Sequence, residues 1–152
     1  MIHAVIDTNV IVSALLTHNA QSATIKVIEA IEKGWIMPLY NDEILEEYID
    51  VLSRSKFNFS KDLVKQLIGL FYEQGVRAER VCSNEFFPDA KDVVFYEVAI
   101  SKDDAYLVTG NIKHFPKKPI VVTPAEMLEI LMMDKIVQHK NKSTPSHPTI
   151  CS

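Results

Sequence analysis

Short apolar runs alternate with stretches of helical periodicity along most of the chain. Residues 2–6 (IHAVI) form an apolar run with β-branched residues that ends at Asp7, a pattern typical of a buried parallel strand. The same reasoning predicts strands at residues 35–39, 76–82, 104–109 and 119–123. The signal at 76–82 is the weakest of these.

Segments with apolar residues at helical spacing separate the expected strands. They predict helices over residues 9–16, 22–33, 42–53, 61–74, 92–102 and 125–133, while residues 84–91 are expected to form a loop. Asn41 or Asp42 can cap the helix at 42–53, and Ser60 can cap the helix at 61–74. Gly34 and Gly75 are natural helix ends.

Strands alternating with helices indicate an α/β fold with three layers, in which helices cover both faces of a central, mainly parallel, twisted sheet. In such sheets, functional groups gather at the carboxyl ends of the strands. The folded domain is expected to span residues 1–137. From about residue 138 the chain becomes polar and rich in Pro, Ser and Thr, so residues 138–152 are expected to be disordered.

Composition narrows the functional classes. The 152 residues carry 16 basic and 20 acidic side chains, a net charge of -4, which argues against a broad surface that coats nucleic acid. A metal site with a local basic patch remains compatible with this balance. The two cysteines, Cys82 and Cys151, are too few for a disulfide scaffold, so a reducing, cytoplasmic location is expected. Neither a signal peptide nor a membrane-spanning helix is expected.

Polar side chains stand where several of these elements meet. Asp7 follows the first strand, Asn111 follows the strand that ends at Thr109, and Asp92 begins the helix that leads into that strand. Glu47 lies in the helix at 42–53. If the first and fourth strands are neighbours in the sheet, these groups can converge at one point.

Each of these residues also has an ordinary structural interpretation. Asp7 and Asp92 could each cap a helix, and Glu46 and Glu47 could belong to a solvated helix face. Asn111 could serve only as a turn residue. The chain has no G-x-G loop for nucleotides and no G-x-S-x-G elbow for a serine hydrolase. A receiver-like fold would need an acidic pair near the first strand, and Asp7 has no acidic neighbour.

The order of four stretches along the chain favours a functional site over these structural interpretations. The stretches are VIDTNVIVSALL, ILEEYIDVL, PDAKDVVFYEVAI and AYLVTGNIKHF. From about Ile2 to about Leu131, the chain resembles the PIN-domain family of metal-dependent ribonucleases, many of which are toxins of toxin–antitoxin pairs. The resemblance implies an RNA substrate, a Mg²⁺ or Mn²⁺ cofactor, a cognate antitoxin as protein partner, and self-association as a homodimer.

The resemblance also assigns the acidic site residues. The first family acid falls on Asp7 and the third on Asp92. The second falls best on Glu47, beside Tyr48, with Glu43 one helical turn earlier as the fallback. The resemblance implies that Asp7, Asp92 and Glu47 are metal ligands and act in catalysis.

The fourth family acid usually follows the TG turn, where this chain has Asn111. An amide oxygen can still coordinate a hard cation, but one negative charge is lost, which favours one tightly held ion over two. Asn111 is still expected to belong to the catalytic set. The supporting residues that the resemblance implies are Asn9, Ser13, Thr109 and Asp89.

Carboxylates forced together raise one another's pKa, and a bound Mg²⁺ or Mn²⁺ relieves that repulsion. Mg²⁺ prefers oxygen ligands and retains several waters, one of which can act as the nucleophile. Substrate could be held by Lys113 and His114, or by a second cluster formed by Arg54 and Lys56. The alternative is that these are ordinary solvated charges.

Two other functions stay open at this point. The same site could serve a metal-dependent phosphatase or a DNA nuclease. Alternatively, the chain could be a catalytically weak module that binds RNA or a protein partner, which the amide at Asn111 keeps possible.

Overall fold

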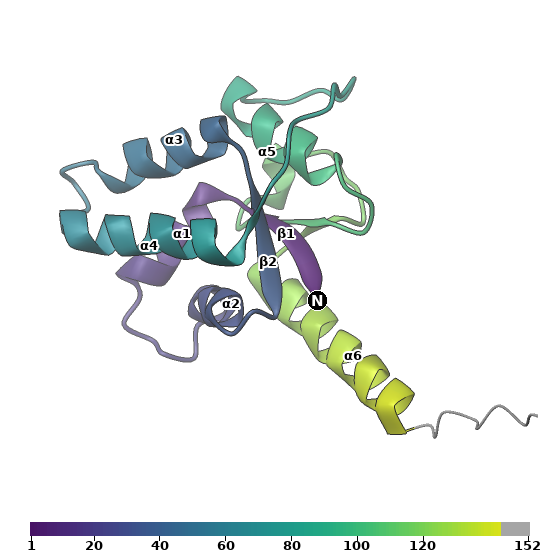
Figure 1. Cartoon of the computed structure of the whole chain (residues 1–152). Coiled ribbons are helices and arrows are strands. Elements are labelled where there is room, and N and C mark those ends of the chain that lie inside the picture. The colour runs from purple at the N-terminus through teal and green to yellow at the C-terminus, as the bar shows by residue number, and fades with distance from the viewer. Residues whose placement is uncertain (144–152) are drawn as a thin grey trace, which may run out of the picture.

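The computed structural model describes residues 1–143, and its centre is a parallel sheet (Figure 1). Within those residues, five strands pair in the order β3-β2-β1-β4-β5, and every pairing is parallel. The strands are β1 (Ile2–Ile6), β2 (Ile36–Tyr40), β3 (Val76–Arg77), β4 (Tyr106–Val108) and β5 (Val121–Val122). This sheet, flanked by helices, confirms the expected α/β class.

Six α-helices surround the sheet in the described part of the chain. They are α1 (Thr8–Leu16), α2 (Ala23–Glu32), α3 (Asp42–Leu52), α4 (Lys61–Gln74), α5 (Val93–Ala99) and α6 (Pro124–Ser143), joined by the short 3-10 turns η1 (Ala90–Asp92) and η2 (Ile112–His114). In Figure 1, α1, α3 and α4 lie on one side of β1 and β2, and α5 lies on the other. None of the helices in residues 1–143 has the length and apolar character that a membrane span requires.

Burial on both faces explains why the strands are continuous apolar runs. Val5 and Ile6 of β1, Ile36 of β2 and Leu107 of β4 are fully buried, and all belong to one core cluster. The longest runs form the centre of the sheet, while β3 and β5 at its edges are two residues long.

Local signals set the helix boundaries as expected. Of the two possible caps of α3, Asn41 is the one used, because its Oδ1 accepts a hydrogen bond of 2.8 Å from the Ile44 amide. Ser60 caps α4 in the same way, through the Leu63 amide. Gly75 ends α4 where any larger side chain would collide with the carbonyl oxygens of Phe71 and Pro38.

Several expected elements are shorter in the structure. The strands expected over 104–109 and 119–123 are reduced to Tyr106–Val108 and Val121–Val122. The strand expected over 76–82 stops at Arg77, because the chain then leaves the sheet and Arg80 pairs with acids on α3 and α5. The helix expected over 92–102 covers Val93–Ala99. Asp92 itself ends the preceding 3-10 turn.

The last helix is longer than the sequence pattern suggests. α6 continues to Ser143, so residues 138–143, expected to be disordered, are helical; the remaining residues of that segment lie outside the described part of the chain. Its distal half is mostly exposed and extends away from the sheet (Figure 1), so polar residues there do not disrupt packing. The Gln138 amide donates a hydrogen bond of 3.1 Å to Asp134, one turn earlier.

Candidate functional site

The carboxyl ends of β1 and β4 lie side by side. Ile6 is in register with Val108, and the Asp7 amide donates a hydrogen bond of 2.9 Å to the Val108 carbonyl. The condition that the sequence left open, that these two strands are neighbours, is therefore met. Their pairing places Asp7 next to Thr109, although 101 residues separate them in the chain.

A cavity of about 280 Å³ opens at this edge of the sheet. It brings together six of the residues singled out from the sequence: Asp7, Asn9, Glu47, Asp92, Asn111 and His114. The other residues that line it are Thr8, Val12, Val51, Phe57, Lys91 and Phe95.

Asp7 lies at the bottom of this acidic cavity and is only 7% exposed. Its side chain makes no hydrogen bond that would cap α1, and instead its Oδ2 accepts a hydrogen bond of 2.7 Å from the Thr109 hydroxyl. Burial raises the pKa of Asp7 to about 6, and the negative charge of Asp92 adds to the rise, while the Thr109 hydrogen bond opposes it. Its environment is therefore unfavourable to an isolated negative charge.

Asp92 reaches the same cavity from the junction of η1 and α5. It also makes no helix-capping hydrogen bond, and its Oδ2 is buried with no hydrogen-bond partner in the part of the chain that the structure describes. The Nδ1 of His114 lies 3.5 Å from that oxygen. Burial raises the pKa of Asp92, and the Asp89 and Glu47 carboxylates raise it further, against the lowering effect of His114.

Glu47 is positioned by its neighbour in α3. The Tyr48 hydroxyl donates a hydrogen bond of 2.5 Å to the Ile6 carbonyl, the last residue of β1, and so fixes α3 beside the end of that strand. Glu47 is half-buried and lines the acidic cavity. Glu43, the fallback, does not line it, because Arg80 holds its carboxylate at 2.7 Å.

The same arginine links the two helices that lead to the site. Arg80 also pairs at 2.6 Å with Glu97, whose side chain is 8% exposed and lies on α5. The other carboxylate oxygen of Glu97 accepts a hydrogen bond of 2.7 Å from the Ser83 amide. Burial raises the pKa of Glu97, but the hydrogen bonds from Arg80 and Ser83 outweigh that effect and lower it.

Hydrogen bonds connect the supporting residues. The Thr109 hydroxyl donates a hydrogen bond to the Asp7 carboxylate and accepts one of 3.0 Å from the backbone N–H of Asn111. The Asn9 side chain accepts from the Gly110 amide at 3.3 Å, so the turn after β4 is held from two sides.

Several predicted residues do not line the cavity: Thr109, Ser13, Asp89, Lys113, Arg54 and Lys56. Ser13 is exposed on α1, and Lys113 is exposed on η2. Asp89 is exposed as well, and its carboxylate accepts a hydrogen bond of 2.9 Å from the Lys91 amide, which caps η1.

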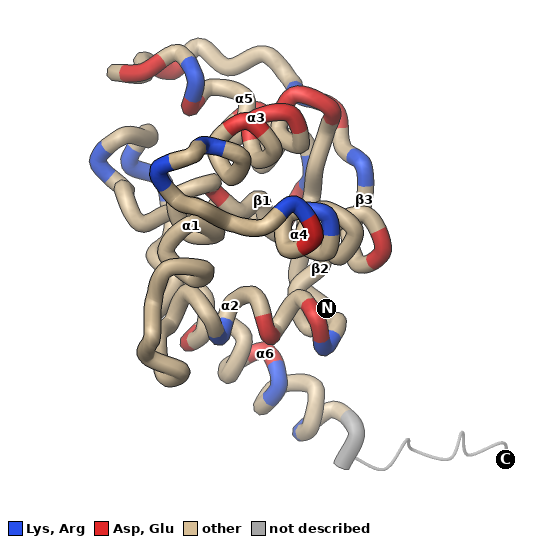
Figure 2. The backbone as a smooth tube through the Cα atoms, turned by 90° about the vertical axis from the view of Figure 1, so that its left-hand side faces the viewer, with Lys and Arg blue, Asp and Glu red and all other residues tan. Residues whose placement is uncertain are grey.

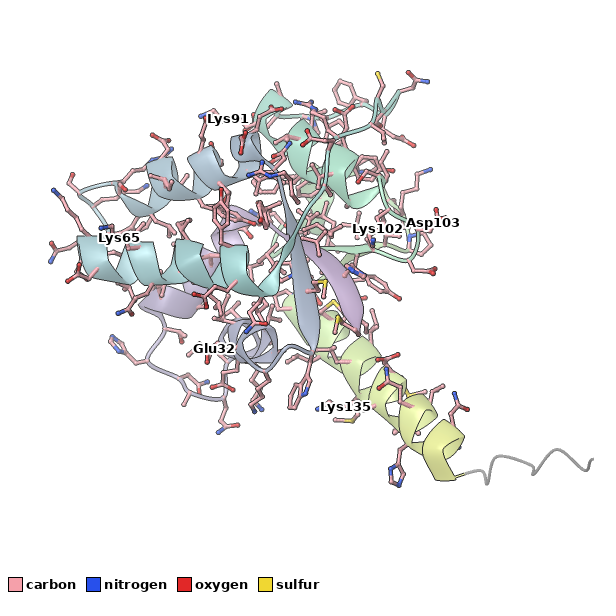
Figure 3. All side chains as sticks on the ribbon, in the orientation of Figure 1. Glu32, Lys65, Lys91, Lys102, Asp103 and Lys135 are labelled. Atoms are coloured by element: carbon pink, nitrogen blue, oxygen red, sulfur yellow. The ribbon has the colours of Figure 1, made fainter. Side chains whose placement is uncertain are left out.

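Lys91 and Phe57 are two of the six lining residues that were not predicted. Lys91, labelled in Figure 3, lies near α3 and the start of α5 and is the basic residue adjacent to Asp92. Its place within the stretch PDAKDVVFYEVAI could have marked it. Phe57 follows the Arg54 and Lys56 pair in the loop after α3, where a lone aromatic residue gives little signal.

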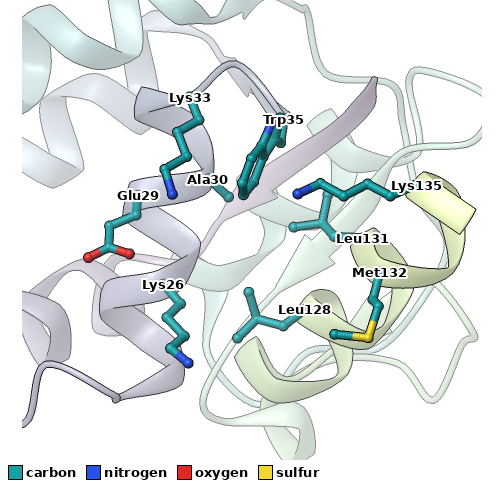
Figure 4. A pocket seen from close by; sticks show the side chains of 9 residues that line it. All are labelled: Lys26, Glu29, Ala30, Lys33, Trp35, Leu128, Leu131, Met132 and Lys135. Carbon is teal, nitrogen blue, oxygen red and sulfur yellow. The ribbon is translucent and has the colours of Figure 1, made fainter. Parts of the chain in front are cut away.

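A second cavity, of about 350 Å³, lies between α2 and α6. Figure 4 shows Trp35 between the side chains of Lys33 and Lys135, whose Nζ atoms lie 4.7 Å and 2.9 Å from the ring centre. Glu29 is the single acid among its nine lining residues, and Lys26 adds a third basic group. Its chemistry therefore differs from that of the acidic cavity and offers no cluster of metal ligands.

The acidic cavity suits a hard divalent cation. Among the described residues, no three His, Cys, Asp or Glu side chains are gathered closely enough to hold a metal ion by themselves. Asp7, which is buried, and Asp92, which is half-buried, nevertheless offer carboxylate oxygens to an ion that keeps most of its waters, as Mg²⁺ does. A cation there would also offset the repulsion between Asp7 and Asp92.

A parallel α/β sheet with acidic side chains gathered at its carboxyl edge is an arrangement found in domains that bind metal ions. A family profile described as PIN domain matches residues 3–113, which include every residue of the acidic set from Asp7 to Asn111. The chain therefore belongs to the PIN domain family, whose members are generally nucleases and typically use divalent metals. Neither a curated protein nor a solved structure matches the chain.

Proposed function

We propose that this chain is a divalent-metal-dependent endoribonuclease that hydrolyses RNA phosphodiester bonds at the acidic cavity. The observation that carries the proposal is that buried Asp7 and half-buried Asp92 line one cavity, each with a raised pKa, and that the Asp92 Oδ2 makes no hydrogen bond within the described residues. Such a pair is costly in a fold unless a cation binds there.

Asp7 and Asp92 would hold the ion, and Thr109 fixes the orientation of the Asp7 carboxylate. When bound, Mg²⁺ or Mn²⁺ supplies positive charge that offsets the charge developing on the phosphate and makes water easier to ionise. Glu47, half-buried at the cavity wall, is placed to bind the ion or to orient the attacking water and accept its proton. Asn111 offers a neutral oxygen, which favours a single resident ion.

Basic groups near the cavity support binding of a phosphodiester. Lys91 and His114 line it, and Lys113 is exposed on the same 3-10 turn as His114. The side chains of these residues would contact phosphate oxygens on either side of the reacting bond. Their number is small, in line with a net charge of -4 and with contact limited to a few nucleotides.

The biological role that we propose is that of a toxin in a toxin–antitoxin pair. The support for this role is that four stretches of the sequence, in their order along the chain, resemble the PIN family, many of whose members are toxins. The same resemblance motivates a cognate antitoxin as partner, a homodimer and a cytoplasmic location. Growth arrest on expression of the wild-type chain, absent with Asp7→Asn, would support it. Normal growth at a protein level that gives RNA cleavage in extracts would contradict it.

The enzymatic test uses purified protein with a structured RNA mixture and a matched single-stranded DNA. Each is incubated with Mg²⁺, with Mn²⁺ and with chelator. RNA cleavage should require metal and should disappear in Asp7→Asn and Asp92→Asn. Glu47→Gln should reduce it strongly, whereas Glu46→Gln, which changes an exposed acid on the same helix outside the cavity, should not.

Asn111 favours one second candidate, a PIN-like module that binds RNA or a protein partner with weak catalysis. Its amide removes the charge that the family usually has at this position. Metal binding detected by calorimetry, without turnover of either nucleic acid, would select this candidate. Cleavage of DNA in preference to RNA would refute the ribonuclease proposal in a different way.

A further inference from the structure

The loop between α3 and α4 carries an aromatic side chain to the acidic cavity. Two backbone hydrogen bonds fold it into turns: the Phe57 amide donates to the Arg54 carbonyl at 3.1 Å, and the Asn58 amide donates to the Ser55 carbonyl at 3.2 Å. Asn58 has a φ of 54°, a left-handed conformation that asparagine tolerates better than most residues. The loop therefore has a defined shape.

Phe57 is supported from behind by a second ring. It stacks on Phe59, with ring centres 5.4 Å apart and planes within 10° of parallel. Phe59 packs against the hydrophobic core, whereas Phe57 lines the acidic cavity with Asp7 and Glu47. Phe59 thus anchors Phe57, and the outer ring is held in place beside polar, catalytic groups.

Positive charges lie close to this ring. The Lys56 Nζ lies over the Phe57 ring, 5.0 Å from its centre, on an exposed side chain that an incoming base can displace towards its phosphates, and Lys91 lines the same cavity. Among the described residues, the Arg54 guanidinium forms one ion pair, at 3.3 Å with the exposed carboxylate of Asp50. Such a pair is weak in water, so Arg54 remains available to a phosphate. Figure 2, turned so that this loop faces the viewer, shows basic residues along it. An aromatic face flanked by cations is the combination that binds single-stranded nucleic acid.

We propose that Phe57 is a stacking platform for an unpaired nucleobase next to the scissile phosphate, with Lys56 and Arg54 contacting the backbone phosphates. The inference rests on the proposed ribonuclease function and assigns to Phe57 the contact with an unpaired base of the substrate. Bases in a duplex are already stacked on their neighbours and cannot present a face to Phe57 without being extruded.

The test measures binding and cleavage separately. Binding is followed in the Asp7→Asn background, so that no substrate is lost, with a short single-stranded RNA that contains the fluorescent base 2-aminopurine. Stacking on Phe57 should quench its fluorescence. Phe57→Ala should abolish the quenching and weaken binding about 5- to 150-fold, the range found for loss of one stacked base.

Matched variants distinguish stacking from packing. Phe57→Trp keeps an aromatic face and should retain binding, whereas Phe57→Leu keeps an apolar side chain and should lose quenching. Phe86→Ala removes a ring that is 84% exposed and outside the cavity lining, and it should behave like the parent. Leucine and tryptophan variants that bind and quench alike would overturn the inference.

The cleavage arm uses the chain with Asp7 intact. Metal-dependent cleavage of single-stranded RNA that falls in Phe57→Ala, with duplex RNA cut poorly by both proteins, is the expected result. If the chain cleaves RNA with metal but Phe57→Ala matches it on single strands, the stacking platform is wrong and the ribonuclease stands. If binding depends on Phe57 but no RNA is cleaved, the ribonuclease is wrong and the platform stands.

Discussion

Replacing Asp7 by asparagine should stabilise the metal-free protein while it removes activity. Asp7 is 7% exposed, and its pKa rises from 3.8 to about 6 in the folded state. Holding that carboxylate ionised therefore costs about 3 kcal/mol of unfolding free energy above pH 6. Asparagine carries no charge, and its side-chain oxygen can still accept the Thr109 hydrogen bond. The expected gain at pH 7.5 is about 1–3 kcal/mol, because the new NH₂ group must find a partner.

The size of this effect should depend on pH, and bound metal should oppose it. A carboxyl group with a raised folded-state pKa destabilises the fold fully above that pKa, and the penalty disappears as the pH falls towards 3.8. The difference in free energy of unfolding between wild type and Asp7→Asn should therefore be largest above pH 6 and should disappear near pH 4. Excess Mg²⁺ should stabilise wild type and leave the variant almost unchanged.

Urea unfolding in chelator at pH 7.5 and pH 4.5, repeated with Mg²⁺, measures all of these differences. Asp50→Asn is the matched control, because its side chain is 68% exposed on α3, and its effect should stay within about 0.5 kcal/mol. An Asp7→Asn variant less stable than wild type at pH 7.5 in chelator would refute the reasoning. So would a stability gain that persists unchanged at low pH.

Three further predictions concern neighbours of the site. Asn111→Asp adds a carboxylate to the acidic cavity and should tighten Mn²⁺ binding several-fold in calorimetry; unchanged affinity would exclude Asn111 from the ion's surroundings. Arg80→Met leaves Glu97, 8% exposed, without its cation and should cost about 1.5–3 kcal/mol in urea unfolding, more than Glu43→Gln at the exposed end; equal losses would contradict this. Thr109→Val removes a hydrogen bond that lowers the pKa of Asp7, so the acidic limb of the cleavage profile should move to higher pH; an unmoved limb would exclude Asp7 as its source.

The central strands and the first acid could be predicted from the sequence because one physical cause fixes both. A strand buried on both faces must be apolar throughout, so the polar residue that ends it, Asp7, marks the carboxyl edge of the sheet. The pairing of β1 with β4, which the sequence left as a condition, is the one found in doubly wound parallel sheets, and it brings Thr109 to Asp7.

Other features depend on contacts that no local pattern contains. Glu43 and Glu47 lie one helical turn apart, and they differ because Arg80 pairs with Glu43 and leaves Glu47 to the cavity. The two partners of Arg80, Glu43 and Glu97, lie 37 and 17 residues from it in the sequence. Phe57 owes its position to stacking on Phe59 and to the fold of a loop. The distal half of α6 gives no amphipathic signal, because it is exposed on most sides and its polar residues face water all round.

The order of strands in the sheet has a consequence for shortened forms of the protein. Asp7 and Glu47 lie in the first third of the chain, but Asp92, Thr109 and Asn111 arrive only with the segment that inserts β4 beside β1. A chain that ends between α3 and β4 therefore carries Asp7 and Glu47 without the residues that complete the acidic cavity. Truncation anywhere between α3 and Tyr106 should remove the site as a whole, even though at least two of its three acids are still present in such a chain.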